Sequence, residues 1–286
     1  MKKKLALLLA LCMAISLFAA CGTSKTPSSS TDISYTPPAS NSDVPSAEPS
    51  ADSDLAYIKD KGTLVVGITD FAPMDYKDDA GNWIGFDADM AKAFAESLGV
   101  DAEFIEINWD NKIMEVQTKA IDCVWNGMTL TDEVKNSMAT SDPYCLNAQV
   151  VVVPADKADQ YQTTDSLKDL KFAVESGSAG QSEVEALNLT FNPVQSQASA
   201  LMEVASGASD ACVIDLLMAG AMIGEGTSYP NLTYTVKLNS EEYGVGFRKD
   251  SDVADAFNTF WKAAYDDGTV METAKTYGVQ ESIIEK

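Results

Sequence analysis

Short apolar runs alternate with helical patterns from residue 64 to residue 277, and this alternation constrains the fold more than any other feature. An apolar run at 64–68 precedes a segment at 90–98 that carries apolar residues at helical spacing. Further strand-like runs occur at 103–107, 122–126, 149–153, 172–174, 191–194 and 211–214, and helical patterns at 109–120, 252–265 and 271–277. Repeated strand–helix units predict an α/β fold whose parallel sheets are covered by helices.

A break near Pro154 divides these units into two sets, because polar residues follow this proline before a new series starts. The region after residue 54 is long enough for two lobes of ordinary size. Ligands of open α/β sheets bind at the carboxyl ends of strands, and clefts between lobes are favoured sites. We therefore expect the functional surface in the loops that follow Ile68, Val124 or Trp125, Val174 and Ile214.

The first 54 residues have the pattern of an export signal and a tether. Three lysines precede an apolar run at 5–18, and Ala19, Ala20 and Cys21 follow it, which predicts a lipoprotein signal peptide at 1–20. Cys21 is similar to the lipidated cysteine of a bacterial lipobox; plain secretion is the alternative. Residues 21–54 are rich in Ser, Pro, Thr, Ala and Asp, which predicts a disordered spacer. The protein is thus expected on the outer face of the cell membrane, attached by its lipid alone.

Composition excludes several function classes. The formal net charge of −23 makes nucleic acid an unsuitable partner, since counterion release needs basic residues. The absence of histidine excludes His-based triads and His metal ligands, so we expect no catalytic residues, no metal and no cofactor. Cys123, Cys145 and Cys212 show no CxxC spacing and are expected to be buried thiols, although a disulfide between two of them stays open.

An ordered series of segments resembles the bacterial extracellular solute-binding proteins of family 3 over about residues 55–280. The segments are GITDFAPM at 67–74, GNWIGFDAD at 81–89, DCVWNGMTLT at 122–131, SDPY at 141–144, SLKDL at 166–170, ESGS at 175–178 and DACVID at 210–215. The resemblance implies a two-lobed periplasmic-binding-protein-like fold of type II, with two crossing strands as a hinge. Lobe 1 would comprise 55–147 and 242–286, and lobe 2 would comprise 148–241.

The family usually holds an amino acid through an arginine on the α-carboxylate and an aspartate on the α-amino group. The arginine position of the family's Thr-x-Glu-Arg motif is Val134 in this sequence, and the threonine of its Gly-Ser-Thr-Gly loop is Ala179. The single arginine, Arg248, is expected at the surface, and Lys135 points about 100° away from Val134 on a helix. Asp215 matches the amine-binding aspartate, with a solvated helix cap as the alternative. The usual carboxylate contacts are therefore missing, while the amine contact is retained.

Aromatic and acidic residues complete the candidate site. The resemblance places Phe71 and Trp109 against the ligand. Trp125 either faces the cleft or packs in the core, and Glu175 either adds negative charge to the site or is solvated. The complete set of expected ligand contacts is Asp70, Phe71, Trp109, Trp125, Asn126, Gly127, Thr129, Val134, Glu175, Ser178, Ala179 and Asp215.

These features together favour a binding function. We expect a lipid-anchored, extracytoplasmic and monomeric substrate-binding protein that delivers an amino acid, or an amino-acid-like amine, to the permease of an ABC importer. Two alternatives have the same fold: a solute-sensing receptor that is not coupled to import, and an enzyme similar to cyclohexadienyl dehydratase. Closure is expected around hinges near 148–150 and 240–242.

Overall fold

The computed structural model describes residues 53–285; the predicted signal peptide, Cys21 and the predicted spacer up to residue 52 lie outside the described residues. The helices are α1 (Asp54–Lys61), α2 (Phe86–Leu98), α3 (Lys112–Gln117), α4 (Asp132–Ser137), α5 (Ala179–Ala186), α6 (Gln197–Ser206), α7 (Leu216–Met222), α8 (Val253–Asp266) and α9 (Thr269–Tyr277), with 3-10 turns η1 (Trp109–Asn111), η2 (Ala155–Gln160), η3 (Thr164–Leu167) and η4 (Gln280–Ser282). The strands are β1 (Thr63–Ile68), β2 (Tyr76–Lys77), β3 (Trp83–Ile84), β4 (Asp101–Glu106), β5 (Cys123–Thr129), β6 (Ala139–Thr140), β7 (Cys145–Asn147), β8 (Gln149–Pro154), β9 (Lys171–Glu175), β10 (Thr190–Val194), β11 (Ala211–Asp215), β12 (Leu232–Lys237) and β13 (Glu241–Phe247).

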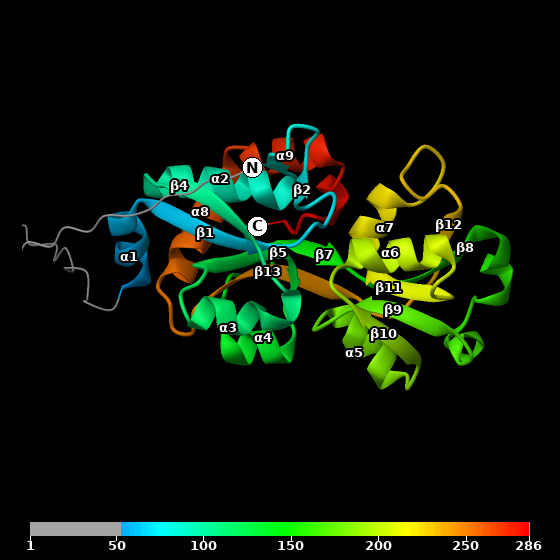
Figure 1. Ribbon diagram of the computed structural model, residues 1–286. Coiled ribbons are helices and arrows are strands. Elements are labelled where there is room, and N and C mark those ends of the chain that lie inside the picture. The colour runs from blue at the N-terminus through cyan, green and yellow to red at the C-terminus, as the bar shows by residue number, and fades with distance from the viewer. Residues whose placement is uncertain (1–52, 286) are drawn as a thin grey trace, which may run out of the picture. The chain divides into compact units, whose positions relative to one another are not determined.

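Sheet 1 has the strand order β4-β1-β5-β13-β6, and β7 pairs with β13 beside this path. Helices α2, α8 and α9 lie on one side of it and α3 and α4 on the other (Figure 1). Successive residues of β5 pack on opposite faces, as the two-residue period of a strand requires: Cys123 and Trp125 join the core under α2 and α8, whereas Val124 joins the core under α3 and α4. Sheet 1 and these helices, with α1, form lobe 1.

Sheet 2 has the strand order β10-β9-β11-β8-β12. Strand β11 alternates in the same way: Cys212 and Ile214 share a core with residues of α6, while Val213 shares a core with Val184 of α5. Helices α6 and α7 therefore cover one face and α5 covers the other (Figure 1). Sheet 2 and its helices form lobe 2.

Both sheets are mixed, which corrects the expectation of parallel sheets. Strands β1, β4 and β5 are parallel, but β13 is antiparallel to β5. In sheet 2, β9, β10 and β11 are parallel, but β8 is antiparallel to β11 and β12. The reason is topological: the chain leaves sheet 1 through β7, enters sheet 2 as β8, and returns from β12 to sheet 1 as β13. Strands β8 and β13 each follow a strand of the other sheet rather than a helical crossover within their own sheet, so no βαβ unit sets their direction.

Two segments differ from the sequence-based expectation. The helix expected at 109–120 is a 3-10 turn followed by α3, which ends at Gln117 before Lys119 adopts a positive φ of 63°. Helix α1 includes Asp54, which the sequence assigned to the spacer, because the Ser53 hydroxyl accepts a hydrogen bond from the Ala56 N–H at 3.0 Å and caps the helix.

Arg248 forms an ion pair with Asp54 and is partly buried, so it is less exposed than expected. Within residues 53–285, no helix has the length and apolar character needed to cross a membrane.

Candidate ligand-binding site

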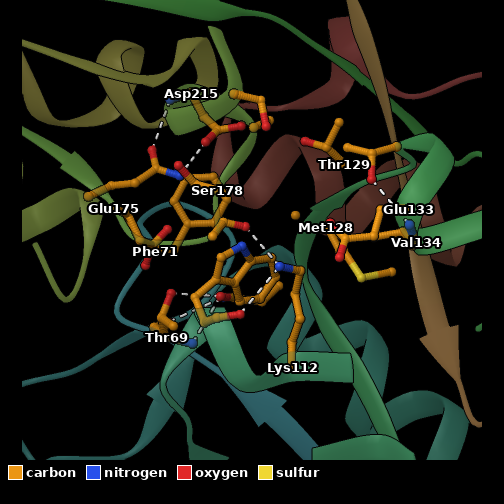
Figure 2. Close-up of a pocket in the computed structure, with 18 of the residues that line it drawn as sticks. Thr69, Phe71, Lys112, Met128, Thr129, Glu133, Val134, Glu175, Ser178 and Asp215 are labelled. Atoms are coloured by element: carbon orange, nitrogen blue, oxygen red, sulfur yellow. Dashed lines mark hydrogen bonds between the residues drawn. The ribbon is translucent and has the colours of Figure 1, made fainter. Parts of the chain in front are cut away.

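A cavity of about 280 Å³ is lined by residues of both lobes. This volume lies near the lower end of the range for small-molecule sites, roughly 300–1,000 Å³. It is lined by Thr69, Phe71, Trp109, Lys112, Asn126, Gly127, Met128, Thr129, Thr131, Asp132, Glu133, Val134, Glu175, Gly177, Ser178, Ala179, Ser182, Gln197 and Asp215 (Figure 2). All the expected contacts are present here except Asp70 and Trp125.

These two residues lie elsewhere. Trp125 is fully buried and packs against the rings of Phe94, Tyr144, Phe257 and Trp261 in the core of lobe 1. Side chains alternate between the two faces of β5, and that of Trp125 points toward α2 and α8, away from the cavity. Asp70 lines two other pockets, and burial, with the nearby Glu106 carboxylate, raises its pKa.

The lobe 1 wall is built by the segment that follows β1 and by the second half of β5. The Asn126 side-chain oxygen accepts hydrogen bonds from the backbone N–H and the hydroxyl of Thr69 at 2.9 and 2.7 Å, which ties the middle of β5 to the residue just after β1. Gly127 has a φ of 54°, and a Cβ on it would lie 2.3 Å from the Phe71 ring. Glycine at this position therefore allows Phe71 to lie directly against β5 at the cavity.

The position that carries arginine in the family pattern forms an apolar part of this wall. Val134 is 3% exposed and belongs to a core cluster with Trp109 and Met128. Figure 2 shows Val134 and Met128 on one side of the cavity and Glu175 and Asp215 on the other. Lys135 is exposed and does not line the cavity.

Sequence reasoning missed Lys112, the one basic side chain among the described residues that line the cavity. Its ammonium donates hydrogen bonds to the Gly177 carbonyl at 2.8 Å and the Trp109 carbonyl at 3.3 Å. Gly177 belongs to lobe 2, so this lysine links the lobes. Burial lowers the pKa of Lys112, while the carboxylates of Glu133 and Glu175 act in the opposite direction. The signal was present in the sequence: Lys112 follows Trp109 by three residues, which places both on one face of a helix.

The lobe 2 wall is acidic because two parallel strands end in acids. Glu175 is the last residue of β9 and Asp215 the last of β11, and β9 and β11 are neighbours in sheet 2. The carboxyl ends of parallel strands meet at one edge of a sheet, so both side chains reach the same part of the cavity. Asp215 also occupies the N-cap position of α7, but its side chain makes no capping hydrogen bond.

Asp215 is surrounded by protein donors. It accepts hydrogen bonds from the Tyr243 hydroxyl at 2.5 Å, the Gln149 amide at 3.1 Å, and the amides of Asn147 and Gln197. Glu241 lies in the same network and accepts from Asn147 and Gln149 at 2.7 and 2.8 Å. Burial and the Glu241 carboxylate raise the pKa of Asp215, and the bonds from Tyr243 and Gln197 counteract this in part.

Glu175 is buried like Asp215 but is less well satisfied. Its side chain is 3% exposed, and its Oε1 atom has no hydrogen-bond partner within residues 53–285. Burial, followed by the Asp215 carboxylate, raises the pKa of Glu175 to about 8, against the opposing effects of Lys112 and of a hydrogen bond from the Gln197 side chain. Of the two alternatives left open by the sequence, solvation is not what the structure shows.

The chain is similar in sequence and fold to known binding proteins. A family model described as bacterial extracellular solute-binding proteins, family 3, matches residues 64–280. The arginine-binding extracellular protein ArtP of Bacillus subtilis (strain 168) is 28% identical, over 97% of this chain and 98% of that protein. The arginine-bound form of truncated ArgBP from T. maritima is 34% identical with a TM-score of 0.69, over 73% of this chain and 99% of that one.

A third similar protein is the ancestral amino acid-binding protein AncCDT-1, described as a precursor of cyclohexadienyl dehydratase. Its crystal structure is 33% identical with a TM-score of 0.72, over 79% of this chain and 99% of that one. These similarities confirm the predicted two-lobed periplasmic-binding-protein fold. All three relatives are named as binding proteins.

Proposed function

The chain belongs to the bacterial extracellular solute-binding proteins, family 3, and from this premise we propose that it is a lipid-anchored receptor that passes an amino acid or an amino-acid-like amine to the permease of an ABC importer. The observation that carries the proposal is the cavity between the lobes, with two buried acids on the lobe 2 wall and aromatic rings on the lobe 1 wall. The N-terminal pattern around Cys21 supports the anchor. We also propose that the protein binds its ligand without converting it chemically, and that it acts as a monomer.

The charge of the cavity favours a ligand with an ammonium group. Asp132, Glu133, Glu175 and Asp215 face a single lysine among the lining residues that the structure describes. The rings of Phe71 and Trp109 add π-faces that attract cations. A free amine thus finds both charge and ring complementarity here. The relatives named for arginine binding act on an amino acid that also carries a positive side chain.

A ligand carboxylate has a partner as well, although Val134 replaces the family arginine. The Lys112 ammonium has three N–H donors, and two of them are directed to carbonyl oxygens. Ser178 and Ala179, at the start of α5, also line the cavity, and the first turn of a helix offers backbone N–H groups to an anion. Lys112 and this turn would replace the bidentate arginine contact.

Thermal unfolding tests the ligand class. We expect at least one amino acid, or its decarboxylated amine, to raise the melting temperature of the purified protein. A ligand at about 100 times its dissociation constant adds about 2.7 kcal/mol, which is a shift of roughly 5–10 °C for a chain of this size. The assay compares each amino acid with its own decarboxylated amine. If no member of either set shifts the melting temperature, the proposed function is wrong.

Lys112→Met tests the carboxylate partner. The substitution keeps the long stem but removes the ammonium, so affinity for an amino acid is expected to fall about 10-fold, as for a lost charged hydrogen bond. Affinity for the decarboxylated amine should change by less than about 2-fold. Calorimetric titration measures both, and Lys135→Met, on the exposed face of α4, is the matched control. Equal losses for the two ligands would instead assign Lys112 to holding the lobes together through Gly177.

A further inference from the structure

Glu175 and Asp215, the acids at the carboxyl ends of β9 and β11, differ in how many hydrogen bonds their carboxyl oxygens accept. Asp215 accepts hydrogen bonds from four side chains, namely those of Asn147, Gln149, Gln197 and Tyr243. A carboxylate has about four acceptor sites, so these donors occupy most of its capacity. Oε1 of Glu175, by contrast, is buried without any partner in the described part of the chain.

A buried polar atom without a partner is costly in a folded protein, commonly by about 1–3 kcal/mol, and is uncommon for that reason. Glu175 lines the cavity beside Asp215 and faces the aromatic wall (Figure 2). A ligand that donates an N–H to Oε1 would supply the missing hydrogen bond.

We propose that Glu175, rather than Asp215 alone, holds the ligand's ammonium group in the cavity, and that this contact expels the proton which Glu175 carries in the empty site. The proposal rests on the proposed function and specifies which acid the ligand meets. Asp215 then serves mainly to position Gln197, which lines the cavity, and Tyr243, whose ring packs edge-on against Phe71.

The proton balance follows from the surrounding charges. Asp215 of β11 disfavours ionisation of Glu175, Lys112 of α3 favours it, and Asp132 and Glu133 of α4 add negative charge at the same cavity. The pKa values of Glu175 and Asp215 are each raised to about 8, so this pair of acids retains a proton at neutral pH. We place that proton on Glu175, because Asp215 accepts hydrogen bonds from four side chains whereas Oε1 of Glu175 has no partner among the described residues. An incoming ammonium stabilises the carboxylate, so the carboxyl O–H bond breaks, the proton leaves to the solvent and the ion pair remains.

This exchange sets the sign of the pH dependence. Below the pKa of the empty site, binding must release a proton, so affinity rises with pH; above it, Glu175 is already ionised and affinity levels off. The ammonium of an aliphatic amine, with a pKa near that of lysine at about 10.4, stays charged throughout. The dissociation constant is therefore expected to fall by up to about 10-fold per pH unit below about pH 7.5 and to be constant above about pH 8.5.

The test uses the full chain and the standard amino acids with their decarboxylated amines; the tightest binder of the wild type becomes the probe. Calorimetric titration from pH 6 to pH 9 compares the wild type with Glu175→Gln. This variant keeps the size of the side chain, removes the charge, and is expected to bind the probe about 10- to 100-fold more weakly at high pH and to lose the pH slope. Glu185→Gln makes the same chemical change at an exposed position of α5 and is expected to behave as the wild type.

The possible results distinguish failure of the proposed function from failure of the role assigned to Glu175. Absence of any binder in the wild type would refute the proposed function itself. A wild type that binds, combined with a Glu175→Gln variant that retains either its affinity or its pH slope, would overturn the role of Glu175 while leaving the function intact. A second measurement needs no variant: titration of the wild type at pH 7 in two buffers of different ionisation enthalpy should show release of close to one proton, and none released overturns the proposal.

Discussion

Asp215→Ala is expected to weaken ligand binding by about 100-fold or more and to lower the free energy of unfolding by about 1–3 kcal/mol. The first effect arises because the carboxylate holds Gln197, which lines the cavity, and Tyr243, whose ring packs edge-on against Phe71. The second arises because the substitution leaves buried donors without an acceptor. Relief of repulsion with Glu241 offsets part of the stability loss.

Chemical denaturation measures the stability change, and titration with the probe measures binding. Asp169→Ala, at an exposed position of lobe 2, is the matched control and should alter neither quantity by a measurable amount. The variant also has a diagnostic pH profile: without the Asp215 carboxylate, the pKa of Glu175 falls, so any residual binding should level off at a lower pH than in the wild type. Full affinity in Asp215→Ala would show that the ligand uses neither this acid nor the side chains that it positions.

Trp125→Ala is expected to destabilise the protein by about 3–5 kcal/mol while leaving the affinity of the remaining folded protein nearly unchanged. The indole is fully buried among aromatic rings, with centroids 4.9 Å from Phe257 and 6.3 Å from Trp261. Its removal leaves a cavity that rigid neighbours on α8 cannot fill.

Denaturant unfolding followed by circular dichroism checks this value, and titration at low temperature checks binding. Trp83→Ala is a suitable comparison, since Trp83 lies partly exposed on the short strand β3 and should cost clearly less. A large loss of affinity, with stability preserved, would assign Trp125 to the ligand and contradict its place in the core.

Local patterns determined much of this protein from the sequence. Apolar runs bounded by turn residues marked most of the strands, and the acids at the ends of two such runs, Glu175 and Asp215, marked the acidic wall of the cavity. Phe71 and Trp109 were predicted from the resemblance to the family. The ordered motifs identified the family, and the family model over residues 64–280 confirms it. Such features are local because a strand, its end and the following turn are specified by neighbouring residues.

Only the tertiary structure decided which hydrogen-bond partners these residues have and how deeply they are buried. Asp215 meets Asn147 and Gln149 across sequence separations of 68 and 66 residues, because β7 and β8 carry the chain between the sheets beside β11. The same crossing makes both sheets mixed, and the pleat of β5 turns Trp125 into the core. Lys112 reaches the cavity through a bond to Gly177, 65 residues away. Hydrogen-bond supply and burial depend on which distant segments meet, and short-range patterns in a sequence carry no record of that. For this reason the sequence could name Glu175, but only the folded chain shows that one of its oxygens is left for a ligand.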